Sequence, residues 1–403
     1  MVWVAYLVFV AGLGYGLWHG VHDLLTQTKP AIDLQVYLTG ARALVRGQNI
    51  YNVLSPNGLP FTYPPFAAAI FTPLSWLGRG LPVELIWLGC NVAALGRTCW
   101  VLTVGSEVER GLLGDDRRAR AALLFGISMA LEPVLASVSY GQINLLLLWI
   151  VTEDRLVPRW RRAAGVGLGV AAGVKLTPTL FLPFLLLAGR RKDAVRMVAT
   201  FLGTVTIGIL VAPSASLHYW RHLVFTSDRI GLPSYISNQS LRGALERTGI
   251  AHSAVLWSLL AIAVAVVGLF AAARADRAGQ TLHALAAVAL TMLLISPISW
   301  THHWVWLLPL VALLLFAPLT DRAGLVLLLC WLFATITWLV WKVAPVGRPT
   351  PRLAWDDQIL GDSYTILACV SLVWLVVRIR QASGPVPSAD PTDDVPTARD
   401  TAG

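Results

Sequence analysis

Long apolar segments constrain the fold of this chain more than any other feature. A helix needs about 20 mostly apolar residues to cross the hydrocarbon core of a bilayer. Only 13% of the 403 residues are charged, about half the share in a soluble domain. We therefore predict an all-α polytopic membrane protein surrounded by lipid. This excludes a soluble enzyme, a nucleic-acid-binding domain and a secreted disulfide scaffold. The predicted apolar segments are 2–25, 83–104, 119–137, 194–212, 252–273, 281–297, 303–319, 323–342 and 362–378.

Basic residues indicate which helix ends face the cytoplasm. The segments 106–120, 153–162 and 189–196 contain four Arg or Lys residues each, and such loops remain on the cytoplasmic side of a membrane. The regions 119–152 and 163–188 lie between these basic segments, and each is too long for one crossing. We predict that each consists of two short helices that meet on the outer side.

The segment 63–78 decides the number of crossings. A full span there would move the loop with Arg117 and Arg118 to the outer side, so we predict an interfacial or re-entrant helix instead. This leaves about twelve transmembrane helices, with periplasmic interfacial helices and both termini in the cytoplasm. Residues 1–378 then form one domain embedded in the plasma membrane. Residues 379–403, rich in proline and aspartate, form a disordered cytoplasmic tail.

Polar groups at membrane depth mark functional sites, because burying them in lipid is unfavourable. In this chain they are concentrated at the predicted outer helix ends. A transporter needs such groups along a path through the bilayer, often with inverted repeats. The asymmetry therefore predicts a site at the outer membrane surface, for a molecule that enters from lipid. A glycolipid transporter or flippase remains the alternative from another class.

Asp33 opens the first outer loop. Leu34, Tyr37 and Leu38 follow at helical spacing, which predicts a short amphipathic helix at the interface. Two interpretations fit the carboxylate. It caps this helix, or it acts as a base that takes a proton from an acceptor hydroxyl.

Two outer breaks carry further polar residues. Gln142 and Asn144 follow the break at Tyr140-Gly141, where they either bond freed backbone groups or contact a sugar. Lys175 stands at the second break. It either extends to the outer headgroups or binds a lipid phosphate.

The second long outer loop ends in Asn238, Gln239 and Arg242. Amides with an arginine suit the recognition of hydroxyl and phosphate groups, and the alternative is a capped turn before a short helix. The segment 61–66, with its tandem prolines, either forms one wall of a groove or simply begins a helix.

His302 and His303 lie between tryptophans at a predicted outer helix junction. Helical neighbours point about 100° apart, so this pair does not resemble two metal ligands one turn apart. Either one histidine contacts a phosphate while the other packs, or both belong to an interfacial aromatic belt. The candidate contacts to a sugar or a prenyl chain are Tyr37, Tyr63, Gln142, Asn144, Asn238, Gln239 and Trp300. The alternative for the aromatic residues among them is that they anchor the protein at the membrane interface.

No metal or other cofactor is predicted. The chain has no Asp-x-Asp motif, and we interpret Asp356-Asp357 as part of a solvated loop. The cysteines form no CxxC pair, so we expect buried thiols rather than a zinc site. They are Cys90, Cys99, Cys330 and Cys369.

Seven short motifs occur in the order expected for glycosyltransferase family 87, which the sequence resembles between about residues 30 and 305. They are Asp33-Leu-Gln-Val-Tyr37, Gly47 to Tyr51, Thr62-Tyr-Pro-Pro65, Gly141-Gln-Ile-Asn144, Lys175-Leu-Thr-Pro178, Asn238-Gln-Ser-Leu-Arg-Gly243 and Ser296-Pro-Ile-Ser-Trp-Thr-His-His303.

The resemblance implies a GT-C fold with its active site on the periplasmic side. It implies an inverting α-(1→2)-mannosyltransferase that uses polyprenyl-phosphate-mannose to extend mannosylated glycolipids, such as phosphatidylinositol mannosides or lipomannan. Asp33 is then the catalytic carboxylate, and His302 or His303 lies near the donor phosphate. Lys175 and Arg242 are the predicted phosphate-binding cations. A related transferase for another polyprenyl-phosphate sugar, such as arabinofuranose, is the alternative.

Overall fold

The computed structural model describes residues 1–26, 31–103, 113–114, 116–226, 229–318, 320–344 and 352–382. Apart from two isolated β-bridges, the regular structure of these residues is helical, so the predicted all-α fold is confirmed for them. The helices are α1 (Val2–Thr26), α2 (Ile32–Val45), α3 (Pro65–Ser75), α4 (Leu81–Leu102), α5 (Arg117–Ser128), α6 (Glu132–Ser139), α7 (Asn144–Leu156), η1 (Pro158–Ala163), α8 (Val166–Val174), η2 (Thr177–Leu180), α9 (Phe181–Leu187), α10 (Arg191–Val211), α11 (Pro213–Arg221), η3 (Leu223–Phe225), α12 (Leu241–Thr248), α13 (Ser253–Arg277), α14 (Thr281–Ile295), η4 (Thr301–Leu307), α15 (Leu308–Leu315), α16 (Arg322–Ile336), η5 (Leu339–Lys342), α17 (Trp355–Gly361) and α18 (Ser363–Ala382).

Four helices in the described residues, α1, α4, α10 and α13, are long and apolar enough to cross a membrane. Two bent pairs, α5 with α6 and α17 with α18, raise the number to six if each pair is one span. The other apolar segments are divided into shorter helices, because proline, glycine and polar residues interrupt them. The chain is therefore rich in membrane-type helices, and a total of about twelve spans stays a prediction.

The two long regions between basic segments are broken, as predicted, but not identically. Region 163–188 consists of α8 followed by η2 and α9, and its break falls at Lys175 and Leu176. Region 119–152 contains three helices instead of two, because a second break precedes Glu132. There α5 and α6 meet at an angle of 72°, and Pro133 in the first turn of α6 favours a new helix start.

The segment 63–78 contains only α3, an 11-residue helix. Such a helix is about 16 Å long, roughly half the thickness of the hydrocarbon core. This agrees with the prediction that the segment does not span the membrane. The helix begins at Pro65, directly after Pro64, and Thr62, Tyr63 and Pro64 line a cavity. The segment 61–66 is therefore both a helix start and part of a cavity wall.

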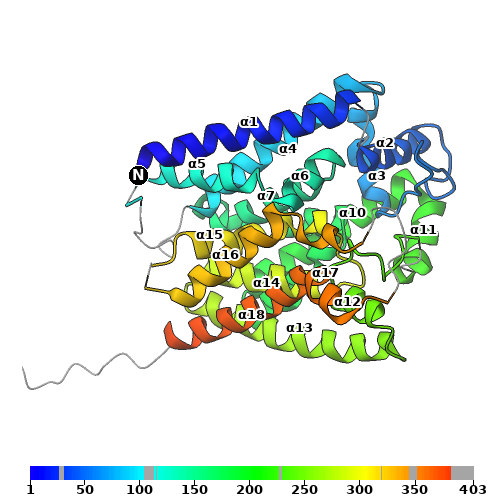
Figure 1. Cartoon of the computed structure of the whole chain (residues 1–403). Helices are drawn as coiled ribbons and strands as arrows, with labels where there is room; N and C mark the ends of the chain where they lie inside the picture. The colour runs from blue at the N-terminus through cyan, green and yellow to red at the C-terminus, as the bar shows by residue number, and fades with distance from the viewer. Residues whose placement is uncertain are drawn as a thin grey trace, which may run out of the picture.

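Three of the short helices lie together at one end of the helical bundle. In Figure 1, α2, α3 and α11 lie at the right, while the N-terminus and the end of α18 lie at the left. Both ends of the described chain are therefore on the same side, as an even number of crossings requires. Helices α1 and α5 pack closely, since a Cβ atom added to Gly12 would lie 2.2 Å from the carbonyl oxygen of Gly126.

The interior is formed largely by α14 and α15, whose side chains are nearly all buried. In contrast, α13 exposes large apolar side chains such as Leu259 and Ile262, each 62% accessible. An apolar surface of this extent needs lipid to cover it. Cys90 and Cys330 are also exposed, so the expectation of buried thiols is wrong for these two, which point outward from α4 and α16. Cys99 is buried as expected.

The last helix runs slightly beyond the predicted boundary between membrane domain and tail, and that division of the chain stays a prediction. Helix α18 continues to Ala382, past the predicted boundary at residue 378. The remainder of the predicted tail, residues 383–403, lies outside the described residues.

Candidate active site

Asp33 lies in the first turn of α2 and does not cap it. The helix begins at Ile32, with Ala31 in the capping position, and no side chain makes a capping hydrogen bond. The backbone N–H of Asp33 donates to the carbonyl of Tyr140 at 3.0 Å. The capping interpretation is therefore wrong. The start of α2 is instead docked on the turn between α6 and α7, and its carboxylate is available to the neighbouring cavity.

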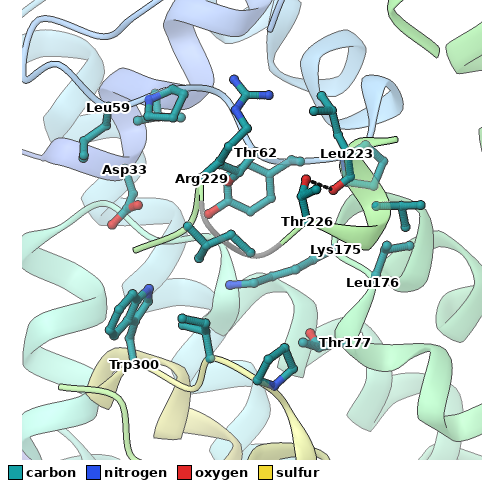
Figure 2. A pocket seen from close by; sticks show the side chains of 18 of the residues that line it. Asp33, Leu59, Thr62, Lys175, Leu176, Thr177, Leu223, Thr226, Arg229 and Trp300 are labelled. Atoms are coloured by element: carbon teal, nitrogen blue, oxygen red, sulfur yellow. Dashed lines mark hydrogen bonds between the residues drawn. The ribbon is translucent and has the colours of Figure 1, made fainter. Parts of the chain in front are cut away.

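This cavity has a volume of about 230 Å³. Figure 2 shows Asp33 and Lys175 extending into it from opposite sides, with Trp300 nearby. The predicted site residues that line the cavity are Asp33, Tyr63, Gln142, Lys175, Trp300 and His303. Residues as far apart in sequence as Asp33 and His303 thus meet around one cavity.

Lys175 is held in the cavity wall by two acceptors. Its Nζ donates to Asn144 Oδ1 at 2.9 Å and lies 3.1 Å from His303 Nε2. Because the ammonium of Lys175 can only donate, Nε2 of His303 is the acceptor. The proton of the neutral His303 ring is therefore on Nδ1. Lys175 is therefore fixed beside the cavity instead of extending to the headgroups, and its remaining donor capacity suits an anion.

The two histidines occupy different places. His303 lines the cavity, whereas His302 lies behind the wall, 7% accessible. His302 Nε2 lies 3.2 Å from Gln142 Nε2, and its carbonyl accepts from Ser137 Oγ at 2.7 Å. The two rings are perpendicular, with centroids 4.7 Å apart. His303 is thus placed to meet a ligand, and His302 supports the wall.

Gln142 connects the carboxylate with a buried tyrosine. The Tyr37 hydroxyl lies 3.1 Å from Gln142 Oε1 and 3.2 Å from the Tyr63 hydroxyl. Burial raises the pKa of Asp33 to about 6, although a hydrogen bond from Gln142 and the charge of Lys175 lower it. Asp33 is therefore mostly ionised at neutral pH and still basic enough to accept a proton. Tyr37 is fully buried and positions Gln142 instead of lining the cavity.

The amides of the second outer loop are structural. Asn238 Oδ1 accepts from the backbone of Ser299 at 2.8 Å, which ties the loop to the segment before η4. Gln239 donates to the carbonyls of Ile236 and Gly361, and both amide residues are fully buried. Ser240 caps α12 by accepting from Gly243. The capped-turn alternative is confirmed, and neither amide reaches the cavity.

Arg242 is not brought to the cavity. It lies 3.9 Å from Glu246, one helical turn further along α12, and its guanidinium is 5.3 Å from the Trp257 ring. The cation that lines the cavity beside Lys175 is instead Arg229, which donates to the carbonyl of Tyr51 at 2.9 Å. Arg229 could not be found from the sequence, because an arginine in an outer loop gives no sign that it turns inward.

The described residues contain no group of three or more His, Cys, Asp or Glu side chains arranged to hold a metal. Asp356 and Asp357 form the first turn of α17, so their assignment to a loop is wrong. Acidic residues in a first turn interact favourably with the helix dipole.

The sequence matches the family model of glycosyltransferase family 87 over residues 61–297. The chain belongs to this family. It is 36% identical to the polyprenol-phosphate-mannose-dependent α-(1-2)-phosphatidylinositol mannoside mannosyltransferase of Mycolicibacterium smegmatis, over 98% of the chain and 94% of the relative. It is 35% identical to the corresponding pentamannoside mannosyltransferase of Mycobacterium tuberculosis, over 87% and 83% of the two chains. No solved structure matches the chain significantly.

For a glycosyltransferase, the cavity brings together the two functions that a sugar transfer needs. Asp33 provides a carboxylate, and Lys175 provides a positive charge on the other side of the same space. Apolar side chains, including Leu176, Leu223 and Val224, complete the lining. This combination suits a donor with a lipid and a phosphate on one side and a hydroxyl acceptor on the other.

Proposed function

We propose that this glycosyltransferase transfers mannose from polyprenol-phosphate-mannose to the 2-hydroxyl of a mannose on a phosphatidylinositol mannoside. The names of the relatives support the proposal, because all four specify this donor and an α-(1-2) linkage at 34–36% identity. The names differ in whether they specify a pentamannoside, so the proposal concerns the acceptor class and not one acceptor.

In the proposed reaction, Asp33 takes the proton of the acceptor hydroxyl. The oxygen attacks C1 of the donor mannose, and the bond between C1 and the phosphate oxygen breaks, with the electron pair leaving on the phosphate. A β-linked donor becomes an α-linked product in a single displacement. Lys175, oriented by Asn144 and His303, stabilises the leaving phosphate. In this proposal, side chains alone accept the proton and stabilise the leaving phosphate, and no metal is assigned to either role.

One observation carries this proposal: the carboxylate of Asp33 and the ammonium of Lys175 line one cavity from different elements, α2 and the break after α8. An inverting displacement needs the base and the leaving group on opposite faces of the sugar. A base directly beside the phosphate-binding cation would not suit it. His303, Tyr63 and Trp300 line the same cavity and are the proposed contacts to phosphate and sugar.

We place the cavity on the outer side of the plasma membrane in a GT-C fold, with both termini in the cytoplasm. Helix α10 leads at its end into α11, which contributes Tyr219 to the cavity. At the opposite end of α10, Arg190 and Arg155 pair with Asp276 at 2.7 and 2.9 Å. The basic helix ends are therefore remote from the cavity, and the positive-inside rule supports their cytoplasmic placement.

Replacing Asp33 with Asn tests the proposal. We expect the rate of mannose transfer to fall by about 10²–10⁴-fold, because general base catalysis is lost while the shape of the side chain is kept. The assay uses the purified protein in detergent, synthetic polyprenol-phosphate-mannose and a phosphatidylinositol mannoside, and binding of the donor is measured in parallel. Detergent removes both membrane sides, so turnover there also excludes transport as the required activity.

Three outcomes decide the test. Near-normal transfer by the Asp33→Asn protein would reject the base. Wild-type activity with a polyprenol-phosphate arabinose donor, but not with the mannose donor, would reject the donor. Linkage analysis that finds a bond other than α-(1→2) would reject the proposed acceptor hydroxyl.

A further inference from the structure

A second cavity, of about 80 Å³, lies against α2 on a different face from the catalytic cavity. Asp33 lines the catalytic cavity, whereas Leu34 and Leu38 line this one together with the start of α4. None of its lining residues is shared with the catalytic cavity. It is therefore a separate space, which the transfer reaction does not use.

Two arginines line this cavity. Arg42 comes from α2 and Arg79 from the turn before α4. Burial and the charges of Arg79 and Arg46 lower the pKa of Arg42, so the guanidinium groups are close enough to repel one another. Paired arginines in a partly dehydrated site are typical of phosphate binding, because the anion removes this repulsion and accepts several hydrogen bonds.

Glu84 gives the same cavity a negative group. Its side chain lines the cavity, the residue is only 7% accessible, and Oε2 has no hydrogen-bond partner among the described residues. No ion pair of Glu84 with Arg42 or Arg79 is formed, although all three line one small space. A buried carboxylate oxygen without a partner is unfavourable, and a cation or a hydrogen-bond donor from a ligand would satisfy it.

The position of the cavity indicates a lipid ligand. Glu84 is the fourth residue of α4, a candidate membrane span, so it lies about 5 Å along the axis from the helix start. Leu85 and Ile86 beside it are 41% and 47% accessible, and Trp76 is 72% accessible. Exposed aliphatic residues below an exposed tryptophan are typical of the level of lipid headgroups.

We propose that this cavity binds the headgroup of a zwitterionic aminophospholipid. Arg42 and Arg79 bind its phosphate, and Glu84 accepts hydrogen bonds from its primary ammonium. A headgroup of this kind carries both charges on one short spacer and matches both groups of the cavity. An anionic headgroup leaves Glu84 without a cation, and a quaternary ammonium has no N–H to donate. The proposal does not depend on the identity of the transferred sugar.

Native mass spectrometry of the purified full-length protein tests this site. The protein is titrated with phosphatidylethanolamine, phosphatidylcholine and phosphatidylglycerol of identical acyl chains. We expect one molecule of phosphatidylethanolamine to be retained on the order of tenfold more tightly than either other lipid. Glu84→Gln removes this preference, and Arg79→Gln weakens retention of all phospholipids at the site. Arg46→Gln is the matched control, because Arg46 is exposed and does not line the cavity.

The outcomes separate the alternatives. Equal retention of the three lipids by the wild-type protein overturns the proposal. So does a phosphatidylethanolamine preference that Glu84→Gln leaves intact, or tighter retention of phosphatidylglycerol that depends on the arginines alone. Since Arg79 is in an exposed turn, its variant tests the phosphate contact even if Glu84→Gln lowers the stability of the fold. A thermal unfolding curve of each variant, measured without added lipid, shows whether Glu84→Gln has destabilised the fold.

Discussion

At the scale of single residues, Gln142 links the groups that define the active site. Its side chain supports Asp33 through a hydrogen bond, and it contacts Tyr37 and His302 at 3.1 and 3.2 Å. Three residues that line or support the cavity are therefore fixed by one amide. A carboxylate held in this way is already oriented before a substrate arrives, which reduces the reorganisation that catalysis requires.

The pKa of Asp33 predicts how activity depends on pH. Burial raises this pKa from 3.8 to about 6. Only the ionised carboxylate can accept a proton, so activity falls as the pH decreases through about 6. We expect kcat/KM to drop about tenfold per pH unit below that point. The measurement is a pH profile of the purified enzyme, and a profile that is flat between pH 4.5 and 8 would contradict the role of Asp33.

A comparison of two cations tests the phosphate site. Lys175→Gln should lower the transfer rate by about 10²–10³-fold, as expected when a preorganised charge-stabilising donor is removed. Arg242→Gln should leave transfer within about threefold of the wild type, because Arg242 contacts Glu246 and Trp257 instead of the cavity. Parallel initial rates with saturating acceptor provide the measurement. A larger loss of transfer rate for Arg242→Gln than for Lys175→Gln would contradict the assignment of Lys175 as the phosphate-binding cation.

The site residues that could be predicted from the sequence are those whose charge is unfavourable to bury. Asp33 and Lys175 could be found because ionised groups in apolar surroundings need an explanation. Asn238 and Gln239 could not be assigned, since a buried amide satisfies backbone groups as well as it binds a hydroxyl. The choice between His302 and His303 also needed the structure, because only the turn of η4 determines which ring faces the cavity.

At the scale of elements, the turn between α6 and α7 holds the catalytic helix in place. Gly141 has a φ of +67°, and a Cβ atom there would lie 2.7 Å from Cβ of Leu34 in α2. Its carbonyl accepts from Trp87 Nε1 at 2.7 Å. The absence of a side chain at this position allows α2 to approach the turn closely.

Gly141→Ala should therefore affect both stability and activity. A left-handed conformation costs a residue with a Cβ atom about 1–2 kcal/mol, and the contact with Leu34 also displaces α2 and Asp33. Gly47→Ala is the matched control, because Gly47 has the same φ of +67° and open space around it. We expect both variants to lose thermal stability in detergent, Gly141→Ala more than Gly47→Ala because of the added contact with Leu34, and a large loss of transfer for Gly141→Ala alone. Equal activity of the two variants would contradict the role of the close approach.

The breaks in the apolar segments were only partly predictable. The break at Lys175 and the turn at Gly141 coincide with polar residues, proline or glycine, which are local signals. The break between α5 and α6 falls at residues 129–131, just before Glu132-Pro133, so it too has a local signal, although a separate helix between this break and the one at Gly141 was not expected. Packing also contributes, since α5 lies against α1 at Gly12 and Gly126, whereas α6 packs against both α1 and η4.

At the scale of the whole molecule, the proposed orientation in the membrane can be measured. In a cysteine-free background, Asn52→Cys lies in the exposed loop beside the cavity, and Lys192→Cys lies at the exposed start of α10. An impermeant maleimide should label the first variant in intact cells and the second only after permeabilisation. The opposite pattern would place the cavity in the cytoplasm.

The number of spans is the property of the whole molecule that the sequence defined least well. Apolar content identifies α1, α4, α10 and α13 without difficulty. Helices such as α14 and α16, of 15 residues each, are too short to count by length. They lie partly inside the protein, where other helices replace lipid and a shorter or broken segment is tolerated. Hydropathy alone does not distinguish these cases.

The long sequence separation of the cavity walls has a consequence for biosynthesis. The lining begins at Asp33 and ends at His303, and the chain is inserted into the membrane from its N-terminus. A nascent polypeptide therefore has no complete catalytic centre until about three quarters of it has been translated. The enzyme is thus prevented from acting on its lipid substrates while its own insertion is still under way, and no N-terminal fragment that ends before η4 should be active.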